Sequence, residues 1–393
     1  MHWRILWLVW RYFLRLEPHN MQFTDEQNIA IDAIVDWYGD PDRMEIYVAG
    51  YAGVGKTTCV KEAISRIKSI YGIQHVLTGA YTGKAAHVLK KKGNEGAQTI
   101  HSMIYKCVPK RDEEGNETDE FEFVRNAQIM ADLVVLDEIS MVSSDIVEDF
   151  RTFKIKTIVL GDPGQLPPIN GEGAFTSRDP DIFLKQIHRQ AEDSPILELA
   201  TMARNGIALP IGYNKGDVRV LRLTKETAEH IYNPDTQVIC GLNRVRWGIT
   251  QDMRKKLGFT EPFPVASERI ICCKNDKNFG LFNGGMGHIK SISPHSDGAY
   301  KIAANIEGVN YKKMIVDGHL FRQHFTADTM KASWKKKLKE FDWSYVITCH
   351  KAQGSGFPDV TVIDDSDSFR EHKWRWLYTA ATRAETGLTI LVR

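Results

Sequence analysis

The run GYAGVGKT at residues 50–57 constrains the fold of this chain more than any other feature of its sequence. It follows a short apolar segment at 45–49 and leads into the helical pattern KEAISRIKSI. A strand, a glycine-rich turn and a helix in this order are the context that a phosphate-binding loop requires. The alternative is an ordinary glycine-rich turn, but agreement at every fixed position of the motif strongly favours the phosphate-binding loop.

Each residue type in this loop suits the binding of a nucleoside triphosphate. The glycines let the backbone curl, so that successive N–H groups and the N-terminus of the following helix point at the phosphates. Lys56 adds a positive charge, and the hydroxyl of Thr57 can ligate Mg²⁺. ATP and Mg²⁺ are therefore the expected cofactors. The expected nucleotide-binding residues of the loop are Gly50, Gly53, Val54, Gly55, Lys56, Thr57 and Thr58.

A second apolar run ends in an acidic pair that fits the same site. The run at 133–136 has the pattern of a buried strand and is followed by Asp137 and Glu138. In an open α/β sheet, a carboxylate at the carboxyl end of a central strand faces the phosphate loop. Asp137 is thus expected to hold Mg²⁺, and Glu138 is expected to polarise the attacking water as general base.

A third strand is expected at 157–160, and it leads into the loop GDPGQLPPI at 161–169. The prolines stiffen this loop, and Gln165 offers an amide that can sense a γ-phosphate or position the attacking water. By itself the loop is a weak signal, since an ordinary Pro-Gly turn has the same composition.

Net charge and cysteine spacing limit the class of protein. The 393 residues carry 51 Lys and Arg against 50 Asp and Glu, a formal charge of +1. Binding of nucleic acid through bulk positive charge is excluded, although a local basic groove is not. The cysteines show no spacing typical of a zinc site or a disulfide framework, which favours a reducing, cytoplasmic compartment.

Residues 1–20 are expected to form an extension outside the folded core. Their apolar run at 5–10 is too short to span a bilayer or to form a signal peptide, so no membrane partner is expected. They form either an amphipathic interfacial helix or a disordered or non-native extension ahead of Met21. The second interpretation is preferred, because Thr24 and Gln27 mark the start of a well-formed helix at 25–37.

These motifs belong to a longer ordered series. It comprises FTDEQ, GYAGVGKT, TGAYTGKAA, TIHS, LDEIS, GDPGQLPPI, IHRQ, TCHKAQGS and YTAATRA, and it extends from about residue 23 to residue 393. The series resembles that of the superfamily 1 helicases and is most similar to the 5′-to-3′ branch typified by the RecD and phage Dda helicases. Several matches in a fixed order are far more specific than any one of them.

The resemblance implies an α/β fold of two RecA-like P-loop motor domains with parallel sheets, each carrying a small, mainly β insertion. The first motor domain would span residues 21–190, with a hairpin inserted at about 104–127. The second would span residues 191–393, with an SH3-like barrel inserted at about 286–340.

The implied activity is that of an ATP-dependent DNA helicase. It would move along single-stranded DNA from 5′ to 3′ and unwind duplex during replication, recombination or repair. The implied partners are single-stranded DNA and junctions of single- and double-stranded DNA, with a single-stranded-DNA-binding or replication protein as a further candidate, and a monomer is expected. A DNA-stimulated ATPase or translocase that does not unwind is the alternative. A phosphoryl-transfer kinase would share the phosphate loop but has no need of the later motifs.

The resemblance also assigns roles to single residues. Gln27 would recognise the edge of adenine, since an amide offers a paired donor and acceptor. Arg189 and Arg383 would act as arginine fingers on the γ-phosphate, although either alone could equally form a surface ion pair. Gln353 and Gly354 lie where the family links the state of the nucleotide to the binding of the single strand. The expected catalytic set is Lys56, Glu138, Gln165, Arg189 and Arg383.

Contacts with nucleic acid are expected from a different group of residues. Thr82, Gly83 and Lys84 open a helix whose N-terminus can bind a backbone phosphate, but the basic run at 61–92 around them could be only a solvated face. Gly356 departs from the family pattern, because relatives often carry Glu or another polar residue there. The other positions that match strand-holding residues of the family are Thr99, His101, Thr348, His350 and Ser355.

The two insertions contain the candidates for strand separation and a further strand grip. Phe121 and Phe123 would form a wedge that acts by stacking, because acidic residues crowd this hairpin. Two core phenylalanines under an acidic turn are an equal alternative. In the second insertion, lysines around Trp334 would either grip a single strand or end an exposed amphipathic helix. The acidic residues are at 112, 113, 114, 117, 119, 120 and 122, and the lysines at 331, 335, 336, 337 and 339.

Overall fold

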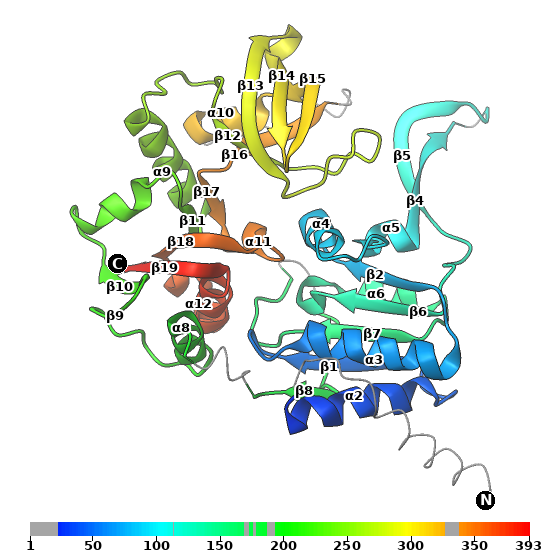
Figure 1. Ribbon diagram of the computed structural model, residues 1–393. Coiled ribbons are helices and arrows are strands. Elements are labelled where there is room, and N and C mark those ends of the chain that lie inside the picture. Colours follow the sequence, from blue (N-terminus) through cyan, green and yellow to red (C-terminus); the bar gives the residue numbers. More distant parts are fainter. Residues whose placement is uncertain (1–22, 113, 169–172, 176–177, 187–192, 327–337) are drawn as a thin grey trace, which may run out of the picture.

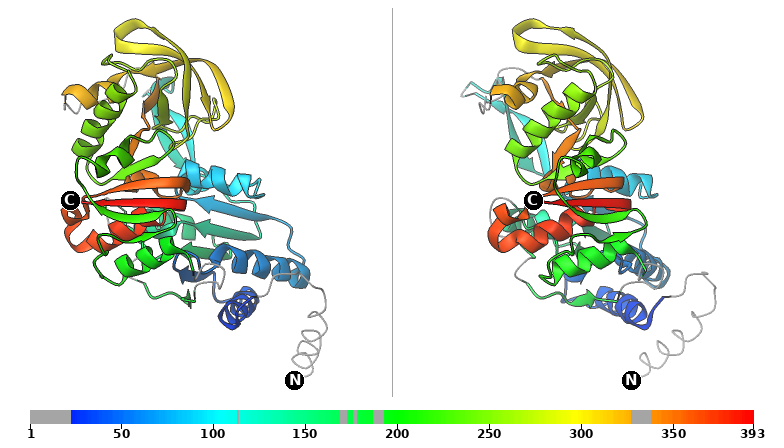
Figure 2. Two further views of the ribbon diagram at one scale, coloured as in Figure 1. Left: turned by 60° about the vertical axis from the view of Figure 1, so that its left-hand side comes forward. Right: turned by 90° about the vertical axis from the view of Figure 1, so that its left-hand side faces the viewer.

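The computed structural model describes residues 23–112, 114–168, 173–175, 178–186, 193–326 and 338–393. Two α/β domains, each built on a six-stranded sheet with helices beside it, lie next to each other (Figure 1, Figure 2). A barrel and a two-stranded hairpin extend from the same side of this pair. The expected α/β class with two largely parallel sheets and two small β insertions is confirmed. No helix in the described part of the chain is long and apolar enough to cross a membrane.

The first sheet has six parallel strands in the order β3-β2-β6-β7-β1-β8. Alternate residues of β1 point to opposite faces. Ile46 and Val48 pack with α2 and α3 on one face, while Tyr47 and Ala49 pack with α5 and α6 on the other. The strands are β1 (Glu45–Gly50), β2 (Val76–Ala80), β3 (Gln98–Thr99), β6 (Leu133–Asp137), β7 (Thr157–Gly161) and β8 (Ile182–Leu184), and the helices are α2 (Asp25–Tyr38), α3 (Lys56–Tyr71), α4 (Gly83–Lys91), α5 (Ile100–Ile104) and α6 (Ser144–Arg151).

The second sheet also has six strands, in the order β17-β11-β18-β19-β10-β9. All of its pairings are parallel except that of β9 with β10. Leu199 of α8 and Trp376 of α12 are buried in the core that this sheet shares with both helices. The strands are β9 (Asn214–Lys215), β10 (Val218–Arg222), β11 (Gln237–Cys240), β17 (Val346–Thr348), β18 (Phe357–Asp364) and β19 (Ala384–Val392), and the helices are α8 (Pro195–Arg204), α9 (Asn243–Lys256), α11 (Cys349–Ala352) and α12 (Lys373–Ala381).

A closed five-stranded barrel is inserted into the second sheet's domain. It begins before the expected insertion at 286–340, because β12 pairs with both β13 and β16 and so closes it. Alternating apolar residues such as Ile302 and Ala304 fill its interior. Most of the lysine cluster around Trp334 lies outside the described residues. The elements are β12 (Arg269–Cys272), β13 (Met286–Pro294), β14 (Ala299–Ile306), β15 (Val309–Asp317), α10 (His319–Thr326) and β16 (Lys339–Trp343).

The hairpin pairs β4 (Tyr105–Arg111) with β5 (Glu117–Arg125) in antiparallel register. Phe123 is 70% exposed, so it is not the core residue that one interpretation of the sequence allowed. Its ring meets that of Tyr105 edge-on, with centroids 6.3 Å apart. The side chain of Phe121 lies outside the described part of the structure.

Candidate nucleotide and nucleic-acid sites

The loop between β1 and α3 has the backbone geometry of a phosphate-binding loop. Gly53 and Gly55 both have φ of 80°, in the left-handed region that residues with a side chain rarely adopt. A Cβ on Gly50 would lie 2.8 Å from Cγ2 of Val54 and 3.1 Å from Cβ of Leu184. The three glycines therefore permit the tight turn that places the N-terminus of α3 at the loop.

Lys56 and Gln27 are both tied to carbonyl groups of this loop. The ammonium group of Lys56 donates to the carbonyl oxygens of residues 50 and 51. Gln27 donates through Nε2 to the carbonyl of Val54 at 3.0 Å, and its Oε1 accepts from the backbone N–H of Thr24 at 3.0 Å. The amide expected to recognise adenine thus holds the loop against α2 and forms the expected capping box with Thr24.

The acidic pair lies at the carboxyl end of β6. Burial, reinforced by the charge of Glu138, raises the pKa of Asp137 to about 6, against the lowering effects of the Glu138 N–H and the Lys56 ammonium. The ionised form of Asp137 is therefore not fully stabilised by the positive charges near it, and a bound divalent cation would stabilise it. Thr57, exposed in the first turn of α3, offers the hydroxyl expected as a second ligand. The residues present fit such an ion.

Glu138 adopts the left-handed conformation, with φ of 54° and ψ of 44°. This is unfavourable for a residue with a side chain, by roughly 1–3 kcal/mol, and such strain concentrates at functional sites. Gln165 is buried, and its Oε1 has no hydrogen-bond partner among the described residues. A free acceptor favours the binding of a water over that of a phosphate, because phosphate oxygens are themselves acceptors.

Of the two expected arginine fingers, Arg189 lies outside the described residues. Arg383 is buried and donates to the carbonyls of Thr379 at 3.0 Å and Ser355 at 3.3 Å, and to Oγ1 of Thr382 at 3.1 Å. These partners are neutral and belong to its own domain. Arg383 is therefore not the surface ion pair that a lone arginine would usually form.

The expected strand-binding segments of the two domains meet. A Cβ on Gly354, which has φ of 73°, would lie 2.8 Å from Cβ of Ala85 and 3.2 Å from Oγ1 of Thr82 on α4. Segment 348–355 of the second domain thus contacts the start of α4 in the first. The hydroxyls of Thr82, Thr99 and Thr348 each accept a backbone N–H and cap the helix that follows. His101 is exposed, His350 is half-buried and Ser355 is buried.

The start of α4 is covered by the barrel. Lys84 forms an ion pair with Glu307, in the turn between β14 and β15, and Lys91 reaches the same carboxylate at 3.2 Å. A Cβ on Gly83 would lie 2.7 Å from Cβ of Phe282, in the segment before β13. Only 11% of the Glu307 side chain is exposed. Within the basic run at 61–92, Lys84 is therefore not part of a merely solvated face, because a carboxylate of the barrel binds it.

Comparison with known proteins identifies the family. Residues 22–219 match the family described as AAA domain, and residues 344–391 match the family described as UvrD-like helicase C-terminal domain. Conjugal transfer protein TraA of Rhizobium radiobacter is 27% identical over 94% of this chain and 32% of its own length. ATP-dependent RecD2 DNA helicase of Deinococcus radiodurans is 23% identical over 86% of this chain and 46% of its own length. The chain belongs to the superfamily 1 helicases.

Within that superfamily this helicase is of the RecD/Pif1-like type. A Pif1 helicase from Bacteroides in complex with ADP-AlF3 and ssDNA has a TM-score of 0.55 at 19% identity, over 94% of this chain and 92% of that chain. An identity this low establishes the shared fold alone. The chain spans less than half of the length of TraA and of RecD2.

Further side chains complete the boundary between the domains of this helicase, and of these only Gln353 was expected from the resemblance. Thr379 accepts through Oγ1 from the N–H of Leu166 at 3.0 Å, and Gln353 donates through Nε2 to the carbonyl of Leu166 at 3.3 Å. Tyr378 contacts the phosphate loop, and its place in the segment YTAATRA beside Arg383 is the signal that could have found it. Glu307 carries no such signal, because it lies in an ordinary turn.

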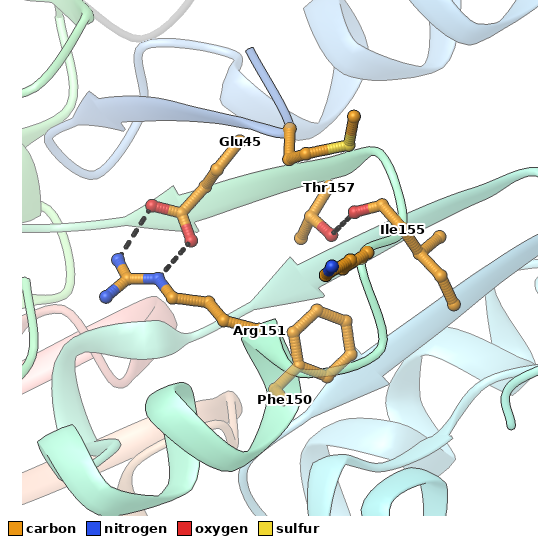
Figure 3. Close-up of a pocket in the computed structure, with 7 residues that line it drawn as sticks. Glu45, Phe150, Arg151, Ile155 and Thr157 are labelled. Atoms are coloured by element: carbon orange, nitrogen blue, oxygen red, sulfur yellow. Dashed lines mark hydrogen bonds and ion pairs between the residues drawn. The ribbon is translucent and has the colours of Figure 1, made fainter. Parts of the chain in front are cut away.

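A pocket in the first domain lies far from this chemistry, at the amino ends of β1 and β7 (Figure 3). Arg151 of α6 binds both carboxylate oxygens of Glu45 there, at 2.9 and 3.2 Å. Phe150 lines the apolar side. Parallel sheets bind their ligands at the carboxyl ends of the strands, so this pocket at the opposite edge is not the nucleotide site.

Proposed function

We propose that this helicase hydrolyses ATP with Mg²⁺ to move along single-stranded DNA from 5′ to 3′ and to separate duplex DNA ahead of it. The observation that carries the proposal is the contact of Gly354 with Thr82 and Ala85. This contact brings together the segments of the two domains that are expected to bind the strand, 348–355 and the start of α4. The phosphate loop lies at the same boundary between the domains. Movement of one domain against the other during hydrolysis would shift one strand-binding segment relative to the other. Repetition of this shift would move the protein along the strand.

The residues of the first domain suit the hydrolytic step. Lys56 would turn from the loop carbonyls to the phosphates, while Thr57 and Asp137 hold Mg²⁺, which when bound neutralises phosphate charge. Glu138 would take a proton from the attacking water, and the free Oε1 of Gln165 would accept a hydrogen bond from that water. Closure of the domains would bring Arg383 to the γ-phosphate as a second source of positive charge.

Three observations support DNA as the nucleic acid along which this helicase moves. The Bacteroides Pif1 helicase of similar fold was solved with ssDNA, and RecD2 is named as a DNA helicase. The exposed ring of Phe123 stands at the hairpin, where it could stack against a base at the fork. Polarity rests on the resemblance to the RecD and Dda branch.

Unwinding of tailed duplexes tests the proposal. Strand displacement is measured on a duplex with either a 5′ or a 3′ single-stranded tail, with ATP and Mg²⁺, and only the 5′-tailed substrate is expected to separate. Activity on the 3′ tail alone would reverse the polarity. Hydrolysis stimulated by single-stranded DNA without displacement of either substrate would identify a translocase that does not unwind.

Glu307→Gln is expected to tighten the binding of single-stranded DNA by about three- to tenfold. The Glu307 carboxylate binds Lys84 and Lys91 on α4, where a DNA phosphate is expected, so phosphate and carboxylate compete for the same cations. The amide of glutamine removes the competing charge but keeps an acceptor for the Met286 N–H. Fluorescence anisotropy of a labelled oligo(dT) at low and moderate salt gives the Kd.

The matched control for this variant is Glu261→Gln. Glu261 is exposed, and the change alters net charge by the same amount without touching α4. Its Kd is expected to stay close to that of the wild type. Equal tightening in both variants would mean that only net charge matters, and weaker binding by Glu307→Gln would show that the ion pair supports the DNA site.

A further inference from the structure

One tyrosine hydroxyl of the second domain reaches the phosphate loop of the first. Tyr378 lies in α12 and is 1% exposed. Its hydroxyl donates to Oδ2 of Asp162 at 2.6 Å and accepts from the backbone N–H of Ala52 at 2.8 Å. Ala52 follows β1 and Asp162 follows β7. A single oxygen atom thus connects two loops at the carboxyl edge of the first sheet to the second domain.

The chemistry of the three groups fixes the direction of both bonds. A backbone N–H can only donate and an ionised carboxylate can only accept, so the phenol accepts from Ala52 and donates to Asp162. Burial, together with the charge of Asp162, raises the pKa of Tyr378 and keeps the hydroxyl protonated. The ring is fixed as well, since a Cβ on Gly164 would lie 2.9 Å from its Cε1.

The contacts continue from Tyr378 to the expected strand-binding segment 348–355. Thr379, the next residue of α12, binds the N–H of Leu166, and the carbonyl of Leu166 binds Gln353. Arg383, just beyond α12, donates to the carbonyl of Ser355 at 3.3 Å. Loop 162–166, α12 and segment 348–355 therefore form a connected set of hydrogen bonds that begins at the phosphate loop.

We infer that Tyr378 is a positioning residue that couples the state of the phosphate loop to the grip on the strand. The inference rests on the proposed function, because it requires segment 348–355 to hold DNA. A backbone shift at Ala52 on nucleotide binding moves the hydroxyl, and with it Asp162 and α12. Separation of the domains breaks both bonds together, so Oδ2 of Asp162 and the N–H of Ala52 lose this partner in the same step, which favours two discrete arrangements over a continuum.

Coupling between nucleotide and DNA binding in the full chain tests this role. Anisotropy gives the Kd of labelled oligo(dT) without nucleotide and with ADP–aluminium fluoride, and the ratio of the two values is the coupling factor. Tyr378→Phe keeps the buried ring and removes both hydrogen bonds, so the factor is expected to fall about tenfold or to approach 1. A factor within about twofold of the wild type in this variant overturns the inference, as does a wild type whose Kd does not respond to the nucleotide.

Tyr345→Phe is the matched control. Tyr345 is also buried, also lies in the second domain, and its hydroxyl is 3.5 Å from the carboxylate of Glu268. It is expected to keep the coupling factor of the wild type, and equal losses in both variants would overturn the inference. Asp162→Asn, which removes the charge at the other end of the bond, is expected to weaken coupling too and serves if Tyr378→Phe does not fold. Failure of the wild type to bind oligo(dT) would instead overturn the proposed function.

Discussion

Lys56→Ala is expected to abolish ATP hydrolysis, with kcat lowered by at least about 100-fold. The ammonium group lies over the loop, where it donates to the carbonyls of residues 50 and 51. From there it can reach phosphates held by the N-terminus of α3, and it is the cation that this loop supplies to the charge developing in the transition state. Phosphate release at saturating ATP, Mg²⁺ and oligo(dT) measures the effect.

Lys61→Ala is the control for this variant. Lys61 lies on the same helix, α3, but is exposed and stands one turn further from the loop. The substitution removes the same charge and the same side-chain length, so general effects on α3 are shared by both variants. Lys61→Ala is expected to keep the wild-type rate. Hydrolysis by Lys56→Ala at the wild-type rate would contradict the assignment of the nucleotide site.

The parts of the fold that could be predicted are those formed by interactions between residues close together in the sequence. Thr24 and Gln27 predict the start of α2 because a capping box is completed within four residues, and the structure forms it. The glycines of 50–57 likewise predict the loop, since each is required by the backbone within it. The resemblance assigned the Gln27 amide to adenine, and nothing local in the sequence indicates that its Nε2 binds the carbonyl of Val54.

The parts that could not be predicted depend on contacts between distant segments. The insertion was expected to begin at about residue 286, and only the pairing of β12 with β13 and β16 shows that β12 is part of the barrel. The bond of Tyr378 to Ala52 spans 326 residues, and that of Lys84 to Glu307 spans 223. Neither pair has a spacing or a pattern that local propensity could detect. The relative placement of the two domains decides both contacts.

Glu138→Gln is expected to retain ATP binding and to stop turnover, lowering kcat by about 100- to 10,000-fold. Glutamine has nearly the same shape but cannot take a proton from the attacking water. Glu138 adopts a left-handed backbone conformation, and glutamine bears a similar backbone cost there, so the folding of the variant is expected to be unaffected. Phosphate release gives the rate, and anisotropy of a fluorescent ATP analogue gives the Kd.

The control is Glu148→Gln on the exposed side of α6, which removes a carboxylate of the same kind close in sequence. Its rate and Kd are expected to match the wild type. Loss of nucleotide binding by Glu138→Gln would assign Glu138 to the metal site beside Asp137, since the cation could then not be held. Fast turnover would leave the free Oε1 of Gln165 as the group that orients the water, and would remove Glu138 from the role of base.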